Sequence, residues 1–364
     1  HKTGKLICLI MLFAGFLVPF SGFSAEIRTL TLDEALSIAL DKNRDIQKAE
    51  EYKNKVQGIY IEQRAAALPQ VTASATAGRS WDAALASVNR YERAESHNLE
   101  LTLTQPVFTW GQVDAAIRAA KFGIATADDQ LRLYRQAALK DVSAAFYDAL
   151  LAKDFYRIAS QSLEQRLKHL EETRRKFALG VATEYDVLAA EVAVENTKPD
   201  TIRTENQIRT SRERLRFLLG VEEEVDVSGQ LRSSIDPTRS YEEAVELAYR
   251  NRPALAELRN RLGVYKELVS VAAAGNKPRV DLKASAGYKD LSFGRADFDG
   301  KTWSVGLALT FPFFDGFRTK GKVAQAESDV SALKIDEAKM LDSISLQIRD
   351  AVNGVKESGD IVRG

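Results

Sequence analysis

Residues Val280–Tyr288 read VDLKASAGY, and this stretch decides the fold of the chain. Apolar side chains occupy every second position, and polar or small side chains fill the positions between them. A period of two over about ten residues is typical of a β-strand with one apolar and one polar face. Strands of about 9–11 residues with this pattern are typical of a sheet that crosses an outer membrane, although the edge of a soluble sandwich would show it too.

Three further stretches alternate in the same way, so the sequence predicts two strand hairpins, over residues 70–106 and 279–312. Proline is tolerated where a ladder or helix hydrogen bond has to end in any case. We therefore expect the junctions between strands and helices at Pro69, Pro106, Pro278 and Pro312. Aromatic residues are expected near the strand ends, as in an interfacial girdle, at Trp81, Phe108, Tyr288, Trp303 and Phe311.

The two hairpins belong to a unit that occurs twice in the chain. Pro69 and Pro278 lie 209 residues apart, and Thr31 and Ser240 are separated by the same number of residues. Thr31 begins TLDEA and Ser240 begins SYEEA, and both stretches have the pattern of a helix-capping box. We expect a short helix to begin at each of them, and the shared offset predicts a tandem repeat.

Long helices are predicted after the strand hairpins. No proline occurs between residues 111 and 177, and apolar residues recur there every three or four positions. At about 1.5 Å per residue this helix would reach about 100 Å, which is longer than a single globular core. A continuous apolar seam of that length predicts coiled-coil packing rather than a bare spacer between two domains. The second long helix is expected to begin near Lys320.

The stretch Leu179–Thr183, LGVAT, predicts a tight turn between two antiparallel helices. Gly180 suits the left-handed position that ends a helix. Thr183 can cap the next helix, with Asp186 three residues later in an arrangement that resembles a capping box. The sequence therefore predicts a helical hairpin with its tip near Gly180.

The helix that returns from this tip is expected to be kinked at Pro199 and to end near Gly220. A short strand is predicted next, at Val225–Val227. After the second strand hairpin the repeat offset is 206 residues, and counterparts of residues 159–220 are absent. We therefore expect the second repeat to be incomplete at its C-terminus.

The first 25 residues have the pattern of a secretory signal peptide, with Lys2 and Lys5 before an apolar run over Leu6–Phe20. A transmembrane anchor is the alternative, but a run of 15 residues is shorter than the ~20 that a spanning helix needs. Cys8 is the only cysteine, so the mature chain would carry no disulfide or thiolate metal site. The expected parts are a signal peptide, a first repeat and a second repeat, over residues 1–25, 26–229 and 230–364.

Charge and histidine content argue against two other classes of function. Without Lys2 and Lys5 the 51 basic residues become 49, against 51 acidic ones, so no basic surplus indicates nucleic acid binding. The histidines show no metal-binding spacing, and no nucleophile elbow or phosphate loop occurs. We therefore predict no enzyme activity, no catalytic residue, no cofactor and no metal site.

In their order and spacing, these features resemble the outer membrane efflux protein family, the TolC-like outer membrane factors. The resemblance covers nearly all of the mature chain. In the first repeat it rests on LDEAL at residues 32–36, Asn43, Leu68-Pro69, QPVF at residues 105–108, the motif F-x-x-G-x-x-T-x-x-DVL from Phe177 to Leu188, and LLG at residues 218–220. In the second repeat it rests on Glu243-Ala244, Asn251, Pro253 and FPFFDG at residues 311–316.

The resemblance implies a mainly α-helical protein with membrane β-strands. Three copies would each contribute four strands to a shared 12-stranded β-barrel, and the long helices would form a coiled-coil tunnel in the periplasm. Four strands cannot close a barrel by themselves, and an open edge in lipid leaves backbone groups unpaired at several kcal/mol each. An oligomer is therefore required on physical grounds, whereas the homotrimer comes from the resemblance.

The implied function is passive export through the outer membrane, in tripartite efflux or type I secretion. Substrates would come from an inner-membrane pump through a periplasmic adaptor, and the cargo, whether drugs, metals or proteins, stays open. Apolar strand positions would face outer-membrane lipid. Polar positions would line the water-filled channel, at Thr72, Ser74, Glu100, Thr102, Asp281 and Lys283.

The tip of the helical hairpin matches the part of the family that contacts the adaptor, at Leu179, Gly180, Val181 and Thr183. The simpler interpretation is that Gly180 and Thr183 only cap two helices, and both can hold. For the whole chain, the main alternative is a periplasmic coiled-coil adaptor or a structural protein without a pore. Adaptors also have helical hairpins, but they lack two amphipathic strand hairpins at matching points of a tandem repeat.

Overall fold

The computed structural model describes residues 27–81, 93–231, 240–293 and 296–363. They form a mainly helical fold with strands, as the sequence predicts. The chain divides into two compact units. One holds Asp148–Phe217, Val221–Gly229 and the described residues before Asp33, and the other holds Asp33–Tyr147, Leu218–Gly220 and the described residues from Gln230 onward. The expected signal peptide lies outside the described residues.

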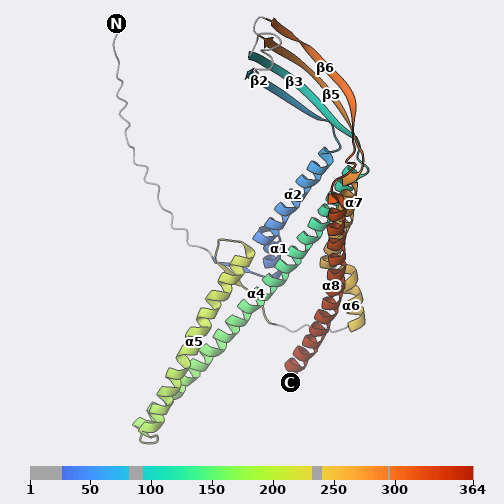
Figure 1. Cartoon of the computed structure of the whole chain (residues 1–364). Coiled ribbons are helices and arrows are strands. Elements are labelled where there is room, and N and C mark those ends of the chain that lie inside the picture. Colours follow the sequence, from blue (N-terminus) through green and yellow to red (C-terminus); the bar gives the residue numbers. More distant parts are fainter. Residues whose placement is uncertain (1–26, 82–92, 232–239, 294–295, 364) are drawn as a thin grey trace, which may run out of the picture. The chain divides into compact units, whose positions relative to one another are not determined.

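Both predicted strand hairpins are present, and they join into one antiparallel sheet (Figure 1). The first hairpin is β2 (Gln70–Trp81) and β3 (Arg93–Phe108), and the second is β5 (Arg279–Phe293) and β6 (Ala296–Thr310). The strand order is β2-β3-β5-β6, so β3 pairs with a strand of the other hairpin. The outer strands β2 and β6 therefore each have one neighbouring strand in the described part of the chain.

The four prolines lie at or near strand ends. β2 begins directly after Pro69, β5 begins directly after Pro278, and Pro312 follows the end of β6 by two residues. Pro106 lies inside β3, and the pairing of β3 with β5 shifts register between Pro106 and Phe108. Proline has no N–H to give to the ladder, so a strand accommodates it at such an irregularity.

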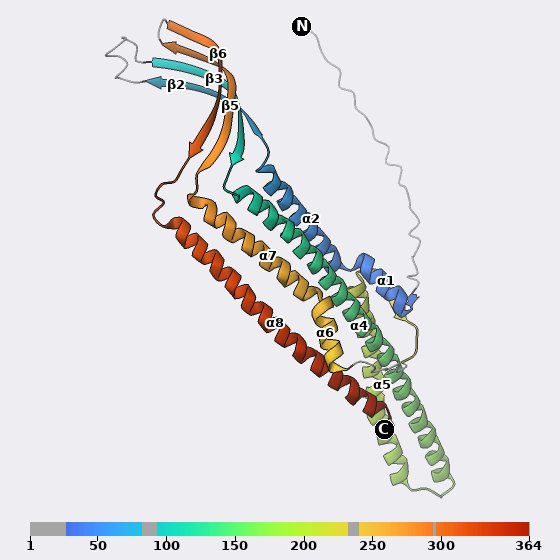
Figure 2. The ribbon, with the colours of Figure 1, turned by 90° about the vertical axis from the view of Figure 1, so that its right-hand side faces the viewer.

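The unit that holds the sheet also contains α1 (Leu32–Lys42), α2 (Arg44–Ala65), the first part of α4 (Gln112–Ala178), α6 (Tyr241–Asn251), α7 (Pro253–Ala273), a 3₁₀ turn (Ala274–Asn276) and α8 (Arg318–Arg363). α7 and α8 run side by side (Figure 2) and share a core of Leu258, Leu262 and Leu333. A second cluster joins α2 to α4 through Ile46, Ala49, Leu131 and Ala138. Among the described residues, none of the helices has the length and apolarity that crossing a membrane requires.

Ser240 begins α6 with the predicted capping box. Its hydroxyl accepts a hydrogen bond from the Glu243 N–H at 3.2 Å, and the Ser240 N–H donates to the Glu243 carboxylate at 3.3 Å. Two backbone donors at the helix start are thereby satisfied. This prediction is confirmed, whereas the matching box at Thr31 and Glu34 stays a prediction.

The other unit is a helical hairpin with a small sheet. The last part of α4 packs on α5 (Glu184–Leu219) through Leu170, Ala190 and Val194. α5 is a single helix through Pro199, so the proline does not end it. β1 (Arg28–Leu30) pairs in parallel with β4 (Val225–Val227), which confirms the predicted short strand. β1 has three residues, which is too few for an alternation to indicate it in the sequence.

Candidate functional sites: the sheet faces and the helical hairpin tip

The register of the strands brings all six predicted pore-facing residues onto one face of the sheet. Paired residues in antiparallel strands share a face, and so do residues two apart on one strand. One row crosses the four strands through Thr72, Thr102, Ser285 and Ser304. Ser74 and Glu100 form the next row, and Lys283 and Asp281 precede Ser285 on β5 by two and four residues. We refer to this surface as the polar face.

Side chains on the polar face bond to one another along and across the strands. The Oγ atoms of Ser285 and Ser304 lie 3.0 Å apart. Arg279 Nε donates to both carboxylate oxygens of Asp281, at 2.9 Å each. Burying such groups without partners costs several kcal/mol, so this face is suited to water rather than to lipid.

The opposite face of the sheet is apolar, and nothing in the described chain covers it. Its rows include Val71, Leu103, Ala284 and Val305, and then Ala73, Leu101, Ala286 and Trp303. Trp303 is 79% exposed and Leu307 is 71% exposed. A continuous exposed apolar surface of this kind marks contact with an apolar partner or with lipid. We refer to this surface as the apolar face.

The apolar face ends before the strands do, and this corrects one expectation. The row Ala77, His97, Asp290 and Asp299 is largely polar although it lies on the same side of the sheet. The sequence places Trp303 and Tyr288 near strand ends, but Trp303 lies at the middle of β6 (Ala296–Thr310), and Tyr288 lies inside β5, five residues before its end. The alternation is visible only along the apolar stretch, whereas the strand hydrogen bonds continue beyond it into polar sequence. From Val280 to Tyr288 the apolar stretch is about 26 Å long.

The two junctions between strand and helix share an uncommon backbone conformation. Trp110 and Gly111 have φ of 52° and 77° before α4, and Gly316 and Phe317 have φ of 63° and 67° before α8. The second pair lies 206 residues after the first, which is the repeat offset seen in the sequence. Positive φ is rare for bulky residues. The two strand hairpins therefore turn into their helices by the same local backbone conformation. Phe313, three residues before Gly316, is 90% exposed.

The tip of the helical hairpin has the predicted caps. Gly180 has φ 74°, its N–H donates to the Phe177 carbonyl at 2.9 Å, and the Val181 N–H donates to the Lys176 carbonyl at 2.9 Å. These two bonds end α4 in a Schellman motif. Before α5, Thr183 Oγ1 donates to Asp186 Oδ2 at 2.7 Å and accepts from the Asp186 N–H at 3.2 Å. The Thr183 side chain, and then its N–H, hold the pKa of Asp186 below its ordinary value.

The tip exposes apolar side chains between and beyond its caps. Leu179 is 79% exposed and Val181 is 76% exposed. Tyr185 and Leu188, in the first turns of α5, are also exposed, although the sequence pattern did not mark them as tip contacts. They lie three residues apart, so helical spacing would have placed them on one side of α5. The caps explain the turn, but they do not explain an uncovered apolar surface.

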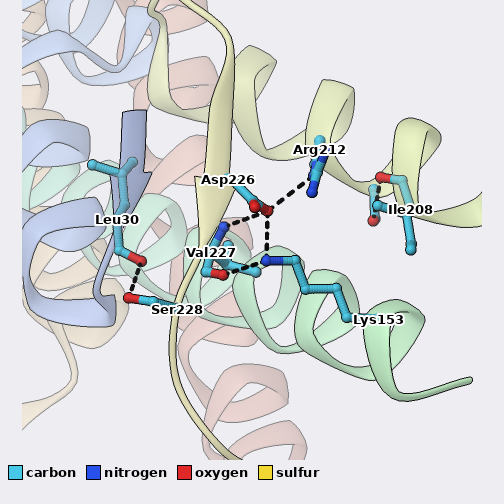
Figure 3. A network of polar contacts seen from close by, with 8 residues as sticks. Leu30, Lys153, Ile208, Arg212, Asp226, Val227 and Ser228 are labelled. Carbon is cyan, nitrogen blue, oxygen red and sulfur yellow. Dashed lines mark hydrogen bonds and ion pairs between the residues drawn. The ribbon is translucent and has the colours of Figure 1, made fainter. Parts of the chain in front are cut away.

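A network of charged groups lies at β4, in the same unit as the hairpin (Figure 3). Lys153 Nζ is 2.7 Å from Asp226 Oδ1 and donates to the Val227 carbonyl at 2.6 Å, and Arg212 Nε donates to Asp226 Oδ1 at 2.9 Å. Burial raises the pKa of Asp226, but the bonds from Lys153 and the Val227 N–H, with the two positive charges, lower it overall. The network ties α4, α5 and β4 together. Its bonded partners lie 14 to 74 residues apart, which is beyond the reach of a helix or strand period, so no periodic pattern could have indicated it.

Comparison with known proteins agrees with this geometry. A family model described as outer membrane efflux protein matches residues 35–221 and 244–359, which confirms the resemblance seen in the sequence. The Pseudomonas aeruginosa outer membrane protein OprJ is 28% identical over 84% of this chain and 64% of its own length. The alkaline protease secretion protein AprF of the same organism is 28% identical over 82% of this chain and 64% of its own length. The chain thus spans about two thirds of the length of these relatives.

The fold is also similar to solved structures. The Campylobacter jejuni CmeC outer membrane channel superposes with a TM-score of 0.77 at 19% identity, over 88% of this chain and 70% of that chain. At this identity the likeness concerns the fold alone. The family description confirms the expected location in the outer membrane.

Proposed function

Because this chain belongs to the outer membrane efflux protein family, we propose that it is a passive export channel of the outer membrane. The observation that supports this most directly is the sheet with one polar and one apolar face, in which the register alone separates the two surfaces. The apolar face would contact lipid, and the polar face would line water. The chain would supply a path across the membrane and no chemistry.

The channel would be completed by further copies of the chain. β2 and β6 each offer an edge of backbone donors and acceptors, and in lipid every such group needs a partner. Pairing of β2 from one copy with β6 of the next satisfies both edges. A homotrimer would then form the 12-stranded barrel that the resemblance implies, with the long helices in the periplasm.

The two repeats, residues 26–229 and 230–364, would each contribute one strand hairpin and one long helix. Junctions at Pro69, Pro106, Pro278 and Pro312 would mark where strands meet helices. The helical hairpin tip would contact a periplasmic adaptor through Leu179, Gly180, Val181 and Thr183, and the adaptor would connect the channel to an inner-membrane pump. Exposed apolar side chains at the tip support this contact, because they have no partner among the described residues.

Paired cysteine substitutions test the two faces of the sheet. Thr102 and Leu101 are neighbours on β3 and lie on opposite faces. In purified outer membranes, a charged water-soluble maleimide should label Thr102→Cys quickly and Leu101→Cys slowly. The natural Cys8 lies in the expected signal peptide, so the unsubstituted protein is the background control. Equal labelling of both cysteines, or protein recovered in the soluble periplasmic fraction, would favour the adaptor alternative.

Charge substitutions test the tip. Leu179→Glu and Val181→Glu should reduce crosslinking to the adaptor and reduce export, because each places a charge in an apolar contact. Ile202→Glu is a matched control, since Ile202 is also exposed on the hairpin but lies far along α5 from the tip. Normal export with intact adaptor crosslinking in both tip variants would show that the tip residues only cap helices.

A further inference from the structure

We propose that Lys283 and Lys289 shift the permeability of the channel towards anionic solutes. The proposal rests on the channel function above, and it concerns the fixed charges on the polar face. Along the described strands this face carries three basic residues, Arg279, Lys283 and Lys289, and two acidic residues, Glu100 and Asp281. The face therefore has an excess of one positive charge in each copy.

The charges on the polar face are not equally free. Arg279 and Asp281 neutralise each other through two hydrogen bonds of 2.9 Å. The charged groups of Lys283, Lys289 and Glu100 make no ion pair or hydrogen bond within the described residues. These three side chains are the ones whose charge would act on a passing ion.

Position along the strands separates the two lysines. Glu100 pairs with Gly287, which lies two residues from Lys289 and four residues from Lys283. Measured along the strand direction, Glu100 is about 7 Å from Lys289 and about 14 Å from Lys283. Charges are screened over about 10 Å at 0.1 M salt. Glu100 therefore offsets much of the field of Lys289 and little of the field of Lys283, so Lys283 should have the larger effect.

The opposite face provides a matched control. Lys301 lies on β6 in the row of Ala75, Leu99 and Tyr288, on the apolar side of the sheet. Like Lys283 it has no ion pair among the described residues, and it is exposed. A substitution at Lys301 removes the same charge from the same sheet without changing the channel side.

The experiment measures the permeability ratio of chloride to potassium for the purified protein in planar bilayers, from the reversal potential in a salt gradient near 0.01–0.1 M. Lys283→Gln should lower this ratio by roughly twofold, and Lys289→Gln should lower it less. Glu100→Gln should raise the ratio, and Lys301→Gln should leave it unchanged. At 1 M salt, where screening acts over about 3 Å, the differences should shrink.

The results separate this inference from the channel function. Conductance that persists in Lys283→Gln with an unchanged ratio would overturn the assignment of selectivity to the lysine. An equal change in Lys301→Gln would overturn the assignment of the two faces. Absence of conductance in the unsubstituted protein would instead contradict the proposed channel.

Discussion

The tandem repeat has two helix corners, α1 to α2 and α6 to α7. In each corner a single residue separates the two helices, but the two corners are stabilised differently. Asn43 separates α1 from α2, and Arg252 occupies the matching position between α6 and α7. Asn43 is buried, and its Oδ1 accepts from the N–H groups of Asp45 and Ile46 at 2.9 and 3.2 Å. Arg252 makes no side-chain cap. The same change of direction is thus made with a polar cap in one repeat and without one in the other.

Long-range contact accounts for the difference. Asn43 Nδ2 donates to the Leu218 carbonyl at 2.7 Å, and Gly220 packs against the Lys42 carbonyl. The first corner therefore holds the segment Leu218–Gly220. The second corner relies on Pro253 at the first position of α7, where its fixed φ suits a helix start. Equivalent elements in a repeat need the same backbone direction, and they can reach it by different side chains.

The largest expected effect is at Gly220. Its φ is 71°, and a Cβ there would lie 2.3 Å from the Lys42 carbonyl oxygen, which is backbone and cannot move aside. Gly220→Ala should lower the free energy of unfolding by about 3–5 kcal/mol. Gly180→Ala is the control, because Gly180 has φ 74° with open space around it and should lose only about 1–2 kcal/mol. Thermal unfolding in detergent, followed by circular dichroism, measures both, and equal losses would contradict the close contact.

The next effect is at the polar cap of the first corner. Asn43→Ala removes a helix cap and the bond to Leu218, so we expect a loss of about 2 kcal/mol. Asn43→Ser keeps a capping oxygen but is too short to reach the Leu218 carbonyl, so it should recover about half of that. Arg252→Ala at the matching position should change the free energy of unfolding by less than about 0.5 kcal/mol. Similar losses at Asn43 and Arg252 would remove the contrast between the corners.

Asp226 tests whether the first repeat has a further stabilising contact near its end. Asp226→Asn should cost about 1–2 kcal/mol at neutral pH, because Lys153 and Arg212 lose a charged partner. The pKa of Asp226 is lower in the folded chain than its ordinary value. The contribution is therefore present above the ordinary carboxyl pKa near 4 and is lost as the pH falls through the lower folded value. The difference between the two proteins should narrow in acid, and a pH-independent difference would contradict the ion pairs.

The smallest effect is expected at Pro253. Pro253→Ala leaves the helix intact but gives the unfolded chain more freedom, so the loss should be about 0.5 kcal/mol. Arg44→Pro is the reciprocal change, since Arg44 begins α2 at the matching position. If Pro253→Ala destabilised as much as Asn43→Ala, the proline would be the equal of the polar cap. Denaturant unfolding midpoints of Pro253→Ala and Asn43→Ala, each compared with the unsubstituted protein, measure the two losses.

Much of the candidate site could be predicted because it depends on neighbours in sequence. The caps at Gly180, Thr183 and Ser240 follow from local backbone chemistry, and the polar face follows from a period of two. The sequence misplaced Trp303 relative to its strand end, because the strand continues where the alternation stops. It did not select Tyr185 and Leu188, since only solvent exposure distinguishes them from core positions.

Apart from the short strand β1, the sequence by itself determined the element types, the turns and the two faces of each strand, because these depend on residues within a few positions of one another. The tertiary structure alone decided that β3 pairs with β5, that β1 pairs with β4, and that Asp226 meets Lys153 and Arg212. Backbone donors and acceptors are the same in every strand, so a local pattern does not specify the partner strand. Only packing of the whole chain brings segments that are distant in sequence into register.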